Sequence, residues 1–139
     1  MNAKKIIDTY ENFALVVTAL AAHSDSANWP YVTVPAFEAQ ATQIMSQTGS
    51  RSFGIAHKVL PEEAEAWVNY TLANQWWKRE SLDYHGLSNV TADPIVPFIW
   101  GDFRNFGPTP PVEKYGFYMP VWQGAPISDG GIANFDSFR

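Results

Sequence analysis

The chain has no cysteine and few charged residues for its 139 positions. Without cysteine it can hold neither a disulfide framework nor a thiolate metal site, and the redox compartment stays open because a domain of this size can be secreted without disulfides. Charged residues make up 17%, well below the usual value of about 25%, and the net charge is −5. No basic surface is available to neutralise phosphates, which argues against nucleic acid and anionic membranes as partners. The adjacent basic pairs Lys4-Lys5 and Lys78-Arg79 are interpreted as solvated faces.

Long apolar runs are also missing. The longest, from Phe13 to Ala22, contains Thr18 and is far shorter than the roughly 20 residues that span a bilayer. Asp8 and Glu11 interrupt the segment that would have to form the core of a signal peptide. The sequence therefore predicts no membrane contact by this segment itself and no targeting peptide.

Common catalytic and cofactor-binding motifs are also missing from the sequence. The chain contains no G-x-S-x-G, G-x-x-x-x-G-K, G-x-G-x-x-G or H-E-x-x-H pattern, so we expect no cofactor, no metal and no catalysis by this chain. His23, His57 and His85 are too far apart in sequence to form a local metal site. His57 lies on an apolar strand face, where a hydrogen-bonded structural imidazole is the favoured interpretation and a small hydrolase using His57 the alternative.

Aromatic residues are abundant: six Trp, six Tyr and nine Phe in a chain that is 46% hydrophobic. This composition predicts one folded domain over residues 1–139 with a single large core. We divide it into a stalk-like helix over residues 1–24 and an α/β body over residues 25–139.

An apolar seam at spacing 4-3-4-3 predicts an amphipathic helix over residues 4–22; its members are Ile6, Tyr10, Phe13, Val17 and Leu20. The seam fits two arrangements. It can pack against the chain's own body, or it can pair with a second copy as a dimer stalk.

Two further elements follow. Pro35 fits the first turn of a helix that Gly49 would end in a left-handed cap. Residues 52–59 alternate as a half-buried strand, whose apolar face comprises Phe53, Ile55, His57 and Val59.

A long helix is predicted from Pro61 to Tyr84, with an apolar stripe that includes Trp67, Leu72 and Trp76. Shorter strands are expected at residues 98–100 and 115–122, where Pro120 indicates an edge or a bulge. A hairpin turn is expected at residues 128–131, and because few residues follow it, we expect an incomplete domain.

Four residues are candidates for a ligand pocket, because aromatic walls around one cation suit a small organic molecule: Trp100, Arg104, Tyr118 and Trp122. Packing in the core is the alternative for each tryptophan. Asn69 and Asn89 match the glycosylation pattern N-x-[ST], and Asn89 is the stronger candidate because it falls in a predicted loop.

Three stretches resemble the extracellular, CHASE-like region of algal receptor-type guanylate and adenylate cyclases. They are the run from Trp29 to Glu38, with the pattern W-P-x-V-T-x-P-x-F-E; Trp67 and Tyr70; and the run from Tyr118 to Gln123 with Pro126. The resemblance covers the chain from about Tyr10 to Phe135. It implies an α+β fold in which a long N-terminal helix packs on a PAS-like antiparallel sheet with a second long helix.

The resemblance also implies a function. The chain would be a ligand-sensing input domain on the extracellular face of a membrane receptor, non-catalytic itself and coupled to a separate nucleotide cyclase domain. Its partners would be an unknown small-molecule ligand and a second copy bound through the N-terminal helix. The alternative is a free secreted protein that binds small molecules or glycans through exposed aromatic residues.

Overall fold

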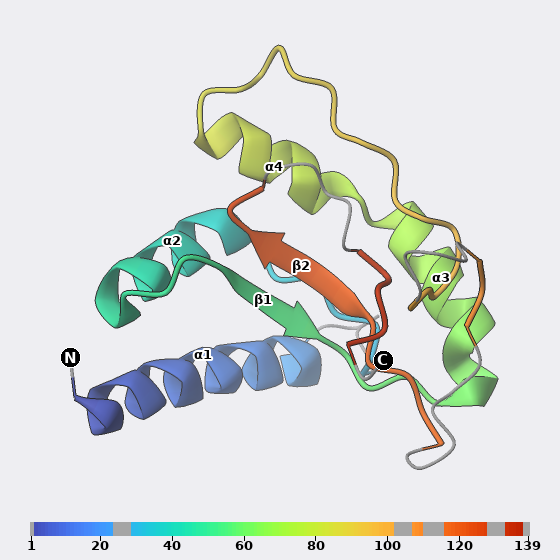
Figure 1. Ribbon diagram of the computed structural model, residues 1–139, viewed down its shortest axis with the longest axis horizontal. Helices are drawn as coiled ribbons and strands as arrows, with labels where there is room; N and C mark the ends of the chain where they lie inside the picture. The colour runs from blue at the N-terminus through green and yellow to red at the C-terminus, as the bar shows by residue number, and fades with distance from the viewer. Residues whose placement is uncertain (1, 24–28, 102–106, 110–115, 128–132, 138–139) are drawn as a thin grey trace.

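The computed structural model describes residues 2–23, 29–101, 107–109, 116–127 and 133–137. Its order of elements is α1 (Ala3–His23), α2 (Phe37–Thr48), β1 (Phe53–Ala56), the short 3-10 helix η1 (Pro61–Glu63), α3 (Ala64–Ala73), α4 (Trp76–Tyr84) and β2 (Val121–Ala125). Strands β1 and β2 pair antiparallel, and Figure 1 shows α1 along one side of this sheet with α3 and α4 on the other. The predicted α+β class, with a long N-terminal helix packed on an antiparallel sheet, is confirmed.

Helix α1 has the predicted boundaries to within one residue. Asn2 caps it, since its side-chain oxygen accepts a hydrogen bond from the Lys5 N–H at 2.9 Å. The predicted seam faces the chain's own body, because Phe13 and Val17 are buried in a core cluster with residues of α2. Of the two arrangements that the sequence left open for the seam, the structure has the internal one.

Helix α2 begins two residues later than the Pro35 pattern indicated. Ala36 takes a left-handed conformation (φ 52°), and its N–H donates to the Glu80 carboxylate of α4 at 2.7 Å, which fixes the start of the helix. Gly49 ends the helix in the left-handed conformation that the sequence predicted, with φ 74°.

The predicted helix over residues 61–84 is wrong as one continuous element. Asn74 interrupts it: the side chain donates to the Tyr70 carbonyl at 2.8 Å and the backbone leaves helical geometry. The interruption shifts the helical phase, so Trp77 is buried while Trp76 is 44% exposed. Lys78 is also buried and donates to the Asp93 carbonyl, which corrects its interpretation as part of a solvated pair.

Strand β1 is shorter than the predicted range 52–59, and the strand predicted over residues 115–122 is wrong in position, because β2 begins only at Val121 and ends at Ala125. His57 and Val59 continue β1 through backbone bonds to Pro120 and Tyr118, both at 3.0 Å. The pairing shifts register between Ile55 and Ala56, close to Pro120, as the proline suggested. Trp100 forms only an isolated bridge with Phe135, and the hairpin turn predicted at residues 128–131 lies outside the described residues.

None of the helices in the described ranges is long and apolar enough to cross a membrane.

Candidate functional site

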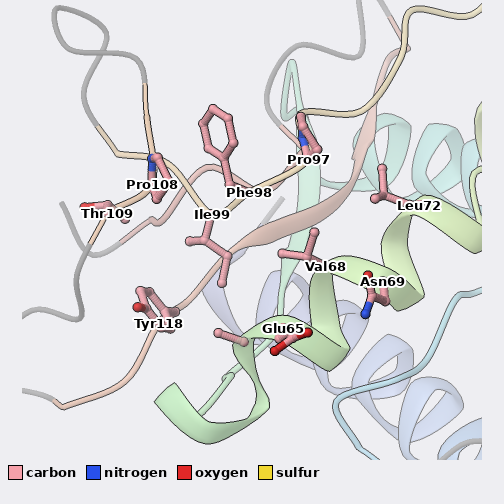
Figure 2. A pocket seen from close by; sticks show the side chains of 11 residues that line it. Glu65, Val68, Asn69, Leu72, Pro97, Phe98, Ile99, Pro108, Thr109 and Tyr118 are labelled. Atoms are coloured by element: carbon pink, nitrogen blue, oxygen red, sulfur yellow. The ribbon is translucent and has the colours of Figure 1, made fainter.

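A cavity of about 390 Å³ lies between α3 and three segments that come later in the chain. We call it the α3 cavity. Figure 2 shows the side chains around it, with Val68 on α3 and Ile99 on a later segment. The residues that line it are Ala64, Glu65, Val68, Asn69, Leu72, Pro97, Phe98, Ile99, Pro108, Thr109 and Tyr118. The walls are predominantly apolar, and hydrogen-bonding groups come from a few polar side chains.

Backbone hydrogen bonds fix the segments that face α3 across the cavity. The Thr109 N–H donates to the Ile99 carbonyl at 3.0 Å, which joins residues 107–109 to the segment that carries Pro97. Tyr118 is held by two backbone bonds with Val59, at 2.8 and 3.0 Å. The wall at Tyr118 is therefore attached to the backbone that continues β1.

Of the three predicted pocket residues that the structure describes, only Tyr118 lines the α3 cavity. Trp122 is fully buried and donates from its indole to the Thr33 hydroxyl at 3.0 Å; Trp100 is 3% exposed and donates to the Ala133 carbonyl at 3.1 Å. Both tryptophans thus belong to the packed interior, the alternative that the sequence left open. Tyr118 lines the α3 cavity, and Arg104 lies outside the described residues.

Sequence reasoning missed most of the α3 cavity. Leu72 falls on the predicted apolar stripe of the long helix, and Ile99 falls in a predicted short strand, so neither pattern indicates a cavity. The available signal was the pair of prolines at 97 and 108, which cannot donate to a strand ladder and so favour irregular segments that line the cavity. A cavity formed by segments this distant in sequence has no local pattern.

A second cavity, of about 320 Å³, separates α1 from β1. It is lined by Phe13, Ala14, Val17, Thr18, Trp29, Ile55, Ala56 and His57. Phe13, Val17 and Ile55 in its wall also pack the core, and its volume is smaller, so we take the α3 cavity as the candidate site.

His57 at this second cavity is a structural histidine. It is fully buried, stacks on the Trp29 ring at 4.6 Å, and donates from Nδ1 to the Pro30 carbonyl at 2.7 Å. Burial lowers its pKa to about 4, against a smaller opposite effect of the Pro30 bond. Its Nε2 is buried and has no hydrogen-bond partner among the described residues, so it is shielded from any dissolved substrate.

Hydrogen bonds join several of the residues that carry the family resemblance. Thr33 bonds both the Tyr70 hydroxyl, at 2.6 Å, and the Trp122 indole. The Gln123 side chain bonds both backbone groups of Val34, accepting from its N–H at 2.8 Å and donating to its carbonyl at 3.0 Å. These contacts join the run 29–38 to the run 118–123, so both motifs are explained by packing.

Glu38, the last residue of the first motif, is 2% exposed. Its Oε1 accepts hydrogen bonds from His85 Nε2, at 2.8 Å, and from the Ile127 N–H, at 3.0 Å. The carboxylate therefore joins α2 to the end of α4 and to the segment after β2. This is an architectural role, since a buried carboxylate needs such partners.

Both glycosylation candidates have exposed side chains, Asn69 on α3 and Asn89 in the turn after α4. Their predicted placements on helix and loop are confirmed, while glycan occupancy stays a prediction. Asn69 also lines the α3 cavity, so a glycan there would stand at its rim.

Within the described residues, no group of three or more histidine, aspartate or glutamate side chains could hold a metal ion. No family model, no curated protein and no solved structure matches the chain.

Proposed function

We propose that the chain is the ligand-sensing input domain of a transmembrane signalling receptor, of the nucleotide-cyclase kind that its motifs resemble, placed on the extracellular face. The observation that carries the proposal is the α3 cavity. Its volume of about 390 Å³ is in the range of small-molecule sites, which are mostly apolar with a few polar groups that fix orientation. The ligand expected there is a small, largely apolar organic molecule that forms one or two hydrogen bonds.

A chain of contacts connects this cavity to the N-terminal helix. Tyr118 forms a bridge with Val59 in the segment that follows β1, and Phe53 at the start of β1 packs edge-on against Phe13 of α1 at 5.1 Å. A ligand that favours one position of Tyr118 would shift α1 if β1 has two alternative positions relative to the helix. These contacts support transmission from the cavity to α1 along β1. A change in the position of α1 on ligand binding would test it.

We expect substitution of Val68 by Phe to block ligand entry, because the larger ring would fill the apolar part of the cavity. The probe is a neutral apolar dye, Nile red, titrated against the purified domain by fluorescence. Val68→Phe should weaken binding by about tenfold or more, equivalent to about 1.4 kcal/mol. The matched control is Ala66→Phe, which adds the same ring at an exposed position of α3 outside the cavity.

Overpacking at Val68 could also cost stability, so circular dichroism must show that the variant is folded. Leu72→Trp provides a second obstruction from the exposed rim, at a side chain that is 40% exposed. Equal dye affinity in the wild type, Val68→Phe and Leu72→Trp would contradict the assignment of the α3 cavity.

The second candidate function is a free secreted binding protein for glycans. Trp29, Trp76 and Tyr84 favour it, since each is between 44% and 51% exposed and sugars stack on aromatic faces. The coding sequence on either side discriminates the two functions, because hydrophobic spans on both sides support a receptor.

We also propose that the chain is not catalytic. The one imidazole that suggested a hydrolase, His57, is buried and bonded to a backbone carbonyl. The purified domain should give no turnover of ester, phosphate or glycoside reporter substrates above a buffer blank. Turnover that disappears in His57→Ala, in a variant that remains folded, would contradict this proposal.

A further inference from the structure

Among the described residues that line the α3 cavity, one carries a charge: Glu65, near the start of α3. Glu65 is exposed, and its carboxylate forms no ion pair or hydrogen bond with any residue that the structure describes. Its charge is therefore balanced by water alone. A carboxylate at the edge of an apolar cavity stabilises a positively charged group on a molecule that binds there.

A second polar side chain lies four residues further along the same helix. Asn69 also lines the cavity, is exposed, and forms no hydrogen bond with a described residue. Residues four apart share one face of a helix, with their Cβ atoms about 5 to 6 Å apart. Figure 2 shows both side chains on α3, the helix that also carries Val68. The Glu65 carboxylate and the Asn69 amide oxygen thus provide neighbouring hydrogen-bond acceptors beside an apolar wall.

The other acidic residues at this end of α3 lie outside the cavity. Glu63 accepts a hydrogen bond from the Leu60 N–H at 3.0 Å, and Glu62 is exposed; neither lines the cavity. The helix dipole favours an acid in a first turn, but it does so for all three glutamates. The position of Glu65 at the cavity is what distinguishes it, and Glu62 is its matched control.

We propose that the α3 cavity binds a primary amine whose ammonium group lies between Glu65 and Asn69. The apolar body of this ligand packs on Val68 and Ile99, which line the cavity. An ammonium group has three N–H donors and no acceptor, so it matches two neighbouring acceptors. Glu65 would repel an anionic ligand. The proposal rests on the proposed function, because it names the class of ligand for the same cavity.

The contribution of the charge should be modest, because Glu65 is exposed and water and salt screen it. At low ionic strength we expect an amine to bind about threefold to fivefold more tightly than a neutral molecule of the same shape. Added salt should reduce this preference, because it screens the attraction between exposed charges.

Tryptamine and tryptophol are the probes, because they share an indole ring and a side chain and differ in an ammonium or a hydroxyl group. Isothermal titration calorimetry of the full chain should show the preference for tryptamine. Glu65→Gln should remove the preference, whereas Glu62→Gln should retain it, although both variants lose one negative charge near the start of α3. The ratio of the two affinities is the readout, since general damage to the cavity would weaken both probes.

Equal affinities of the wild type for the two probes, both lost in Val68→Phe, would overturn the amine and leave the α3 cavity as a ligand site. A preference for tryptamine that persists in Glu65→Gln would overturn the role of that carboxylate. If neither probe binds while Nile red does, the class of ligand is wrong but the sensing function stands. Failure of all three compounds to bind would contradict the sensing function as well.

Discussion

Replacement of Trp67 by alanine should lower the free energy of unfolding by about 3 to 5 kcal/mol. Trp67 is fully buried on α3, and its ring packs against Trp122 at 5.8 Å and His57 at 5.0 Å. Its indole also donates to the side-chain oxygen of Asn134 at 2.9 Å. The variant loses the packing of a large ring and leaves the Asn134 oxygen without that donor, which places the effect at the upper end of the range. Urea denaturation followed by far-UV circular dichroism measures it.

The neighbouring tryptophans of α4 are matched controls for this experiment. Trp77→Ala should cost about 3 kcal/mol, because Trp77 is 2% exposed and packs on Trp122 at 5.6 Å. Trp76→Ala should cost less than about 1 kcal/mol, because nearly half of its surface faces solvent. A loss under about 1 kcal/mol at Trp67, or a larger loss at Trp76 than at Trp77, would show that the buried faces are assigned wrongly.

The difference between Trp76 and Trp77 also shows which part of the fold was predicted wrongly from the sequence. Periodicity predicted α1, α2 and β1 because each buries one regular face, and Gly49 ended α2 for a simple conformational reason. The interruption at Asn74 has no glycine or proline to signal it. It depends on one side chain that bonds the carbonyl of Tyr70. Because the later residues were assigned in the phase of a continuous helix, the exposed and buried tryptophans of α4 were exchanged.

Site prediction failed for a related reason. Aromatic residues near an arginine suggest a pocket, but whether a tryptophan lines a cavity or fills the core depends on partners far away in the chain. Trp122 is packed against Trp67 and Trp77, and Thr33, 89 positions earlier, accepts its indole hydrogen. Gln123 bonds Val34 across the same separation. Of the four predicted residues only Tyr118 reaches the α3 cavity among those the structure describes.

The stability of the domain should depend on pH through His57. Its pKa is about 4 in the folded chain, compared with about 6.5 for an exposed histidine, because burial penalises the charged ring. Protonation would place a positive charge on a ring whose Nε2 is buried without a hydrogen-bond partner among the described residues. The folded state therefore stays neutral at pH values where the unfolded chain is protonated.

The direction in which stability changes with pH follows from the protons that the chain takes up on unfolding. Between about pH 6.5 and pH 4 the unfolded state binds more protons at His57, so the free energy of unfolding falls as the pH falls. The contribution is fully present above about pH 6.5, and from about pH 7.5 to pH 5 roughly 2 kcal/mol should be lost. Because acidification acts on the whole chain and not on His57 alone, the quantity to measure is the difference from a matched variant.

His57→Gln is that variant, because its amide can still donate to the Pro30 carbonyl but does not take up a proton. Urea unfolding of both proteins at several pH values should give curves of stability against pH that converge on acidification, since only the wild type loses the His57 contribution. Parallel curves would contradict the assignment. An NMR titration of the wild type provides a second check, in which the His57 ring should remain neutral at about pH 5.5 while an exposed imidazole is mostly protonated. If the His57 ring titrates near 6.5 in the folded protein, it is not enclosed between Trp29 and Trp67 as the structure has it.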